Sequence, residues 1–334
     1  MPNKETSPSP VDIREDDLLA LSAAVFDTLL RDHTTGQNIF WATHDYEALG
    51  SEYAYHAPIL PHLITGEQGM VIRPRVLKAK EQQADRAKDM AEVFTPSWVC
   101  NKQNNLVDEA WFGRSNVFNT EIDSPNKTHT WLPTEGKITF PEGKTWRDYI
   151  NDNRLEITCG EAPYLVSRYD AVTGEPIPVE RRIGLLDRKL RIVGENTTTS
   201  GEWLRAAQSA FMSIYGYEWQ GDNLVLAREN LLFTFIDYYK AKFGKEPQLK
   251  SIQYIAYITS WNIWQMDGLK GVIPDTCGER REVEHTLFGD EERITVCQGC
   301  KNDDIRVHNG TYALVKDWGA RKEKQKIRFI DLIK

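Results

Sequence analysis

The segment Ile214 to Leu232, "IYGYEWQGDNLVLARENLL", joins a short apolar strand to a helix. The run Ile214 to Tyr217 has the β-branched and aromatic character of a buried strand, and it ends at an acid, Glu218. Apolar residues then recur at helical spacing, at Leu224, Ala227, Leu231 and Phe235. A strand that passes directly into such a helix is the building unit of an α/β protein, so this segment predicts the fold class.

Two further apolar runs end in the same way. The stretch "LEITCGEAPY", residues 155–164, reads as a strand that stops at Cys159 and Gly160. A third strand-like run, Tyr254 to Trp264, reaches Asp267. Helical patterns lie between these runs, which favours a parallel sheet built from βαβ units. Ligands of such sheets bind beyond the carboxyl ends of the strands, where all three polar endings would meet.

The two acids at the strand ends suit a nucleoside. An ionised carboxylate only accepts hydrogen bonds, so Glu218 can accept from two ribose hydroxyls and Asp267 from an adenine amino group. The pattern therefore predicts a cofactor that contains a nucleoside.

Four segments in this order resemble those of the amino-methylating S-adenosylmethionine-dependent DNA methyltransferases, in particular the modification subunits of restriction systems. They are "AEVFTPSWVCNKQNNLV", "LEITCGEAPYLVSRY", "IYGYEWQGDNLVLARENLL" and "NIWQMDGL", which together span about Ala91 to Leu269. The resemblance implies a Rossmann-like methyltransferase sheet, left incomplete, with S-adenosylmethionine as the cofactor.

The resemblance also assigns roles to residues. Phe94, Thr95 and Pro96 would cover the methionine part of the cofactor, Glu218 would hold its ribose and Asp267 its adenine. The remaining cofactor-binding residues that it implies are Glu156, Thr158, Cys159 and Gly160 of the first-strand motif, and Trp219, which would stack on the adenine.

The chain departs from the family in several places, among them a shifted acid at Glu156, Thr158 in place of a proline and an insertion around residues 173–200. Two further departures concern the cofactor loop and catalysis. Ala162 and Pro163 replace the second glycine of the first-strand loop. The family's catalytic tetrapeptide, Asp or Asn followed by Pro-Pro and an aromatic residue, does not occur in the sequence, so no catalytic residue is assigned. The segment His308 to Tyr312, "HNGTY", offers an Asn and an aromatic ring without the prolines, and its alternative interpretation is a turn before a strand.

A cysteine-rich stretch follows the third predicted strand. Cys297 and Cys300 form a CxxC pair, whose thiolates can chelate one Zn²⁺, and Cys277 and His285 could complete four ligands. The alternative is a set of reduced thiols without metal. If zinc is bound, residues 275–304 would be an insertion that the metal ion holds together.

Composition sets the outer limits. The chain has 334 residues, of which 40% are hydrophobic and 27% charged, as is typical of a globular protein. Residues 1–14 should be a disordered tail, 15–115 a helical N-terminal region and 116–334 the methyltransferase-like domain. No apolar run is long enough to span a bilayer and no signal-peptide pattern occurs, so we expect a cytoplasmic protein without a membrane partner.

A net charge of −8 argues against coating nucleic acid by charge alone. Three basic runs could still form a local surface, although such runs are usually solvated faces: residues 73–102, 180–191 and 316–328. The function expected from the resemblance is methylation of an exocyclic base amine in DNA, with a partner subunit that completes the active site or reads the sequence. The alternative is an inactive methyltransferase-fold module that binds DNA or a nucleoside cofactor.

Overall fold

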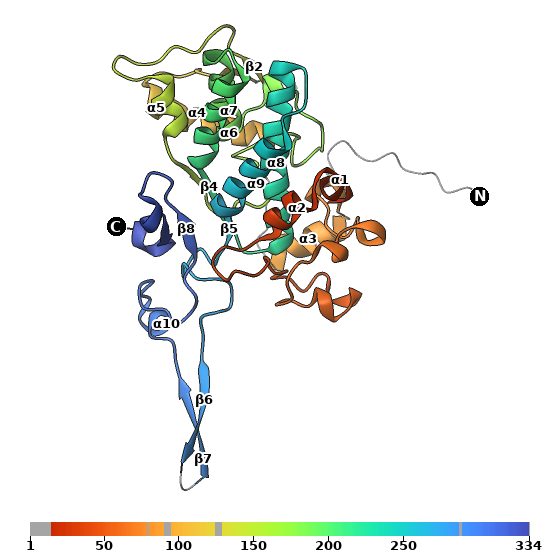
Figure 1. Ribbon diagram of the computed structural model, residues 1–334, viewed down its shortest axis with the longest axis vertical. Coiled ribbons are helices and arrows are strands. Elements are labelled where there is room, and N and C mark those ends of the chain that lie inside the picture. The colour runs from red at the N-terminus through yellow and green to blue at the C-terminus, as the bar shows by residue number, and fades with distance from the viewer. Residues whose placement is uncertain (1–14, 79, 90–94, 124–128, 287–288, 334) are drawn as a thin grey trace, which may run out of the picture.

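The structure is a computed structural model that describes residues 15–78, 80–89, 95–123, 129–286 and 289–333. Over these ranges the chain is a mixed α/β protein with ten α-helices and four small sheets (Figure 1). The predicted α/β class is therefore confirmed, whereas the predicted disordered tail lies outside the described residues.

The sheet of three parallel strands lies at the centre of the fold. It contains β3 (Arg154–Glu156), β4 (Ile214–Glu218) and β5 (Ile263–Gln265), with β4 in the middle. Glu156 pairs with Gly216, and Glu218 pairs with Gln265, so the carboxyl ends of all three strands lie at one edge of the sheet.

Helices cover one face of this sheet. They are α6 (Leu185–Asn196), α7 (Ser200–Met212), α8 (Gly221–Phe243) and α9 (Leu249–Asn262), and the last three of them contact β4 directly. The helix predicted after Glu218 is confirmed as α8. The strand predicted from Tyr254 is wrong up to Asn262, because these residues form the end of α9. Only the last two residues of the run, Ile263 and Trp264, belong to β5, together with Gln265. A short buried apolar run does not distinguish a helix from a strand by its periodicity alone.

A β-hairpin covers the other face. Its strands, β8 (Leu314–Lys316) and β9 (Lys326–Arg328), pair antiparallel. Tyr217 and Trp264 of the parallel sheet pack against Ala313 and Val315 in a second, smaller core. The sheet is therefore enclosed between helices and a hairpin.

The N-terminal region packs against the same main core as the helices. Its helices are α1 (Glu15–Leu21), α2 (Ala23–Leu30), α3 (Lys80–Asp89) and α4 (Ser97–Phe112). Ser22, whose backbone is extended, separates α1 from α2. The fully buried Arg228 of α8 donates to the carbonyl oxygens of Leu29 and Arg31 and to those of Ser260 and Ile263, which joins this region to β5 and α9.

The remaining elements lie toward the periphery. A first hairpin, β1 (Asn119–Asp123) and β2 (His129–Pro133), is followed by α5 (Trp146–Asn151). A longer hairpin, β6 (Arg280–Thr286) and β7 (Gly289–Thr295), projects away from the rest of the chain, and α10 (Gln298–Asn302) lies at its base (Figure 1). We call β6 and β7 the arm.

One basic run is not a solvated face. Arg188 and Lys189, in the run 180–191, are both buried on α6. Arg188 Nη1 lies 2.5 Å from Asp108 Oδ2 of α4, and Lys189 Nζ lies 2.6 Å from the Ser213 hydroxyl. Arg188 therefore pairs with an acid inside the protein, because a buried charge needs a partner. Lys189 contacts neutral oxygen atoms, and burial lowers its pKa well below its ordinary value. No described helix combines the length and the apolar character that crossing a bilayer requires.

Candidate functional site

A cavity of about 900 Å³ opens at the carboxyl ends of the three parallel strands. Its wall is built from the loops after β3, β4 and β5 and from one side of α4. Eight of the predicted cofactor-binding residues line it: Thr95, Glu156, Thr158, Cys159, Gly160, Glu218, Trp219 and Asp267. The topology thus gathers at one place residues that lie up to 172 positions apart in sequence, counted from Thr95 to Asp267.

The two remaining predicted cofactor-binding residues are Pro96 and Phe94. Pro96 directly precedes α4 and is not among the lining residues. Phe94 lies outside the described residues.

The loop after β3 is held by a buried acid. The two carboxylate oxygens of Glu156 accept hydrogen bonds from the backbone N–H groups of Tyr164 at 3.3 Å and Leu165 at 3.2 Å. Burial raises the pKa of Glu156 well above its ordinary value, against the effect of these two hydrogen bonds. Glu156 therefore holds the loop through two backbone hydrogen bonds and also lines the cavity.

Three residues of this loop have left-handed backbone conformations. Their φ angles are +46° at Thr158, +52° at Gly160 and +63° at Ala162. Ala162 stands where the family has its second glycine, and it keeps the conformation that glycine favours. Its side chain is fully buried in the main core and is not among the residues that line the cavity. The alanine therefore does not narrow the cavity.

Glu218 ties the first loop to the second. Its Oε2 accepts from the Gly160 N–H at 2.7 Å, and its Oε1 accepts from the N–H groups of Trp219 at 2.9 Å and Gln220 at 3.3 Å. Burial raises the pKa of Glu218, although the three amides oppose the shift. Because a carboxylate has about four acceptor positions, the group retains capacity toward the cavity.

Asp267 caps the turn that follows β5. Its Oδ1 accepts from the N–H groups of Leu269 at 2.9 Å and Lys270 at 3.2 Å, while its Oδ2 lies 3.4 Å from Lys270 Nζ. The side chain is buried, yet it lines the cavity. Both predicted acids are thus fixed in place by backbone amides before any ligand binds.

A buried ionic cluster attaches the segment before Thr95 to the start of α8. The fully buried Asp222 carboxylate contacts Arg86 of α3, with Nη1 2.9 Å from Oδ2, and also Lys78 Nζ at 3.2 Å and the Tyr46 hydroxyl at 2.8 Å. Burial would raise the pKa of Asp222, but Arg86 and Lys78 hold it well below its ordinary range. Arg86 also donates to Gln220, a residue of the cavity wall.

Sequence reasoning missed the part of the wall that α4 supplies. Gln103, Asn104 and Val107 line the cavity, and Asn104 Nδ2 donates to the carbonyl oxygens of Tyr164 and Ile183. These three positions share one face of a helix, so the helical period of the predicted helix was the signal that could have identified them.

A second group of chemically reactive side chains lies at the base of the arm. Cys277, Cys297, Cys300 and His308 place their ligand atoms within 4.8 Å of one another, so the group could hold a metal ion. The Cys277 sulfur lies 3.2 Å from that of Cys297, 3.4 Å from that of Cys300 and 3.2 Å from His308 Nδ1. Three sulfurs and one imidazole nitrogen are a ligand set that zinc commonly takes.

His308 stands where His285 was predicted. His285 pairs with Asp290 near the far end of the arm, five residues beyond Arg280, and its side chain lies outside the described residues. At about 3.3 Å per strand residue, that distance along β6 exceeds the reach of a histidine side chain. The segment "HNGTY" therefore does precede β8 as a turn, and it brings His308 back to the cysteines.

The backbone around the cluster favours thiolates. The backbone N–H of Asn309 lies 3.3 Å from the Cys297 sulfur. Against the effect of burial, hydrogen bonds from Cys300 and Asn309 and from the neighbouring thiol lower the pKa of Cys297 to about 5. The Cys277 thiol donates to this sulfur, and burial and that hydrogen bond raise its own pKa. These hydrogen bonds favour a thiolate at Cys297.

Comparisons with known proteins identify no similar protein. No family model, curated protein or solved structure matches the chain. The function is therefore argued from the cavity and the cluster themselves.

Proposed function

We propose that the chain binds S-adenosylmethionine in the cavity at the strand ends and transfers its methyl group to an exocyclic amine of a DNA base. The observation that carries this proposal is the position of Glu218 and Asp267. The two buried carboxylates follow adjacent parallel strands, line one cavity and are held by backbone amides. Under this proposal the sheet is a Rossmann-like methyltransferase sheet.

The wall fits the parts of this cofactor. Glu218 would accept from the ribose hydroxyls and Asp267 from the adenine amino group, since both carboxylates are acceptors. The Trp219 ring would stack on the adenine, and Thr95 with the start of α4 would cover the methionine part. The volume of about 900 Å³ lies in the range of small-molecule sites, about 300–1,000 Å³.

The cofactor supplies the activated methyl group, so the protein's task is to orient the two reactants. The acceptor amine would need its own binding groups. The sequence lacks the family's tetrapeptide for this, and among the described residues β3 pairs only with β4. Leu155 and Ile157, at 45% and 64% exposure, lie along β3 and its continuation. We propose that a partner subunit contributes the acceptor site next to β3.

The missing tetrapeptide also favours a second candidate function. The same cavity could serve a module that binds the nucleoside cofactor or DNA without methyl transfer. Both functions share the cavity and differ only in the chemical step.

For the cysteine-histidine cluster we propose a structural Zn²⁺. Three cysteines and a histidine satisfy its tetrahedral preference. The cluster joins the two ends of the arm to the turn before β8, because Cys277 precedes β6 and Cys297 follows β7. A two-stranded hairpin is at best marginally stable alone, so this attachment would hold it in place.

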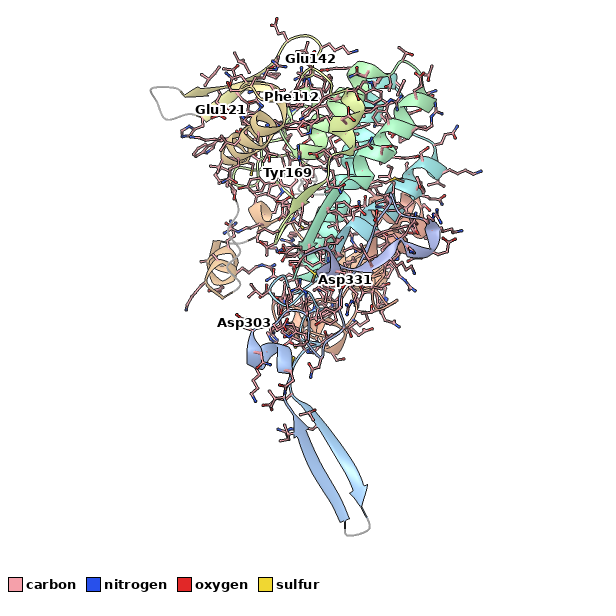
Figure 2. The ribbon with its side chains drawn as sticks, turned by 90° about the vertical axis from the view of Figure 1, so that its left-hand side faces the viewer. Phe112, Glu121, Glu142, Tyr169, Asp303 and Asp331 are labelled. Carbon is pink, nitrogen blue, oxygen red and sulfur yellow. The ribbon has the colours of Figure 1, made fainter. Side chains whose placement is uncertain are left out.

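Isothermal titration calorimetry with S-adenosylmethionine tests the cavity. We expect the wild-type protein to bind, Glu218→Ala to lose binding, and Glu142→Ala to bind like wild type, because Glu142 is exposed and lies far from the strand ends (Figure 2). An unchanged affinity of Glu218→Ala would refute the assignment.

A methyl-transfer assay on DNA of mixed sequence then separates the two functions. Methyl transfer supports the enzyme. If transfer is absent, the assay is repeated with a cell extract from the source of the gene, which would supply a partner subunit. Cofactor binding without transfer under both conditions supports the module. Failure of the wild-type protein to bind the cofactor contradicts the enzyme and the cofactor-binding form of the module.

A further inference from the structure

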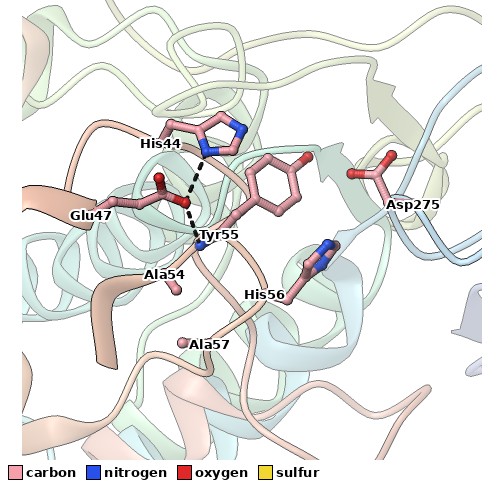
Figure 3. Close-up of a pocket in the computed structure, with 7 residues that line it drawn as sticks. All are labelled: His44, Glu47, Ala54, Tyr55, His56, Ala57 and Asp275. Atoms are coloured by element: carbon pink, nitrogen blue, oxygen red, sulfur yellow. Dashed lines mark hydrogen bonds and ion pairs between the residues drawn. The ribbon is translucent and has the colours of Figure 1, made fainter. Parts of the chain in front are cut away.

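A second pocket lies on the outer side of Trp219. It has a volume of about 510 Å³ and is open to solvent. Its walls come from two places: the segment His44 to Ala57 of the N-terminal region, and Asp275 in the turn after β5 (Figure 3). None of the residues that line this pocket belongs to the cavity described above.

Three of the seven residues that line it carry aromatic rings: His44, Tyr55 and His56. The Tyr55 ring lies 4.8 Å from the His44 ring and 4.8 Å from the His56 ring, measured between centroids. Phe40 lies behind them, 6.0 Å from His56 and 6.4 Å from Tyr55. His56 is exposed and Tyr55 is half-buried, so ring faces remain available to a flat ligand. Stacking on such rings is how proteins hold unpaired nucleobases.

A hydrogen bond joins this pocket to the cavity. The Trp219 indole N–H can only donate, and it donates to the Tyr55 hydroxyl oxygen at 2.9 Å. The Tyr55 hydroxyl points toward the Asp275 carboxylate (Figure 3). Burial, with the nearby Asp275, raises the pKa of Tyr55 to about 12, so the phenol keeps its proton.

The acceptor in the pocket is held in a defined position. Asp275 has a φ of +56°, a conformation that costs energy for a residue other than glycine and that aspartate tolerates better than most. Two residues later Cys277 enters the metal cluster. The second carboxylate, Glu47, already accepts from the Tyr55 N–H at 3.2 Å and pairs with His44 Nδ1 at 2.8 Å. Both contacts use Glu47 Oε1, so both carboxylates retain acceptor positions, and Asp275 is the one that lies toward the hydroxyl end of Tyr55 (Figure 3).

We propose that this pocket binds an unpaired nucleobase that carries an exocyclic amino group, adenine or cytosine, stacked on the exposed His56 ring with its amino group donating to Asp275. The site is separate from the cavity and does not depend on S-adenosylmethionine binding there. A base with a carbonyl oxygen at that position is disfavoured, because two acceptors would face each other.

Calorimetric titration with adenosine and with inosine tests the proposal. The titrations use Glu218→Ala, in which the cavity no longer offers its ribose-binding acid. We expect adenosine to bind about tenfold more tightly than inosine, the effect of one hydrogen bond to a charged group. Cytidine should exceed uridine in the same way. The wild-type protein with S-adenosylhomocysteine in excess provides a second measurement if Glu218→Ala does not fold.

Two variants locate the binding. Asp275→Asn in the same background should lose the preference for adenosine over inosine. His56→Ala should lower the affinity for both nucleosides at least about fivefold, because stacking is lost. The matched control is Asp303→Asn, an exposed aspartate with a φ of +54° outside the pocket, which should behave like its parent.

Equal affinity for adenosine and inosine, absence of binding, or binding that survives both pocket variants overturns the proposal. These outcomes differ from those that would refute the proposed function. If the proposed function fails, the wild-type protein does not bind S-adenosylmethionine, but the adenosine titrations of the Glu218→Ala variant still report on the pocket.

Discussion

The backbone N–H of Gly160 donates to Glu218 Oε2 at 2.7 Å, which joins the loop after β3 to the end of β4. The bond crosses 58 positions of sequence and connects two residues that were each expected to touch the same ligand. It also makes Glu218 part of the protein's own architecture, because the acid is buried and supports the loop that forms the cavity.

The raised pKa of Glu218 has a consequence for stability. Its ordinary value is 4.5 and burial raises it, so the folded protein binds a proton that the unfolded chain has released. Stability from this group is present below about pH 4.5 and is lost as pH rises through the folded-state pKa. We expect urea unfolding of wild type to lose more stability from about pH 4.5 to neutral pH than Glu218→Ala does. A steeper loss in the variant would contradict this.

Asp222 should give the opposite dependence on pH. Its pKa is held below the ordinary 3.8, so its contribution is present above that value and is lost as pH falls below it. Asp222→Asn removes the carboxylate that Arg86 and Lys78 share, while Arg86 keeps its contact with Asp45. The free energy of unfolding at neutral pH should therefore fall by about 3 kcal/mol, the lower end of the range for breaking a buried ion pair. Urea titrations measure the loss.

A double-mutant cycle is the control for Asp222. Arg86→Met alone should also destabilise, and the two changes together should cost clearly less than their sum, because they remove one interaction. Additive effects would show that the pair does not interact.

Thr158→Gly should stabilise the protein. Thr158 is an exposed β-branched residue with a φ of +46°, and a left-handed conformation costs such a residue about 1–2 kcal/mol that glycine avoids. Allowing for the greater flexibility of glycine in the unfolded chain, we expect a gain of about 1 kcal/mol. The same change at Thr120, an exposed residue of β1, should instead destabilise by a similar amount, and thermal unfolding of both variants provides the comparison.

The geometry of the cysteine-histidine cluster predicts that His308, and not His285, is a zinc ligand. Metal analysis of protein purified without chelator should give one zinc per chain, and His308→Ala should lose it or release it to a chelator far more readily. His285→Ala is the matched control and should retain zinc, since His285 lies along the arm. Retention by His308→Ala with loss by His285→Ala would reverse the assignment.

A glycine provides an independent test of the cluster. A Cβ atom at Gly299 would lie 2.5 Å from His308 Nδ1 and 2.7 Å from its Cγ, so Gly299→Ala must displace the imidazole. We expect a loss of zinc affinity of about tenfold or more, by analogy with changes to groups that orient a ligand. At Gly278 an added Cβ meets nothing within 4 Å, and Gly278→Ala should bind zinc normally in a competition titration.

Much of the site was predictable because it depends on local pattern. The strand at Ile214, the helix after Glu218 and the cysteine spacing are signals within short windows of sequence. The predicted third strand was too long, because the apolar run Tyr254 to Asn262 is equally compatible with a buried helix. The loop after β3 looked altered at Ala162, and only the backbone conformation showed that its methyl group points into the core.

The sequence by itself determined the alternation of strands and helices and the acids at the strand ends, because these follow from residue type and near-neighbour spacing. Tertiary structure alone decided that Glu218 bonds to Gly160, that His308 joins the cysteines, and that Tyr55 lies between Trp219 and Asp275. Each of these contacts joins residues that are distant in sequence. Their meeting depends on how the sheet, the N-terminal region and the arm pack together, and no local pattern encodes that packing.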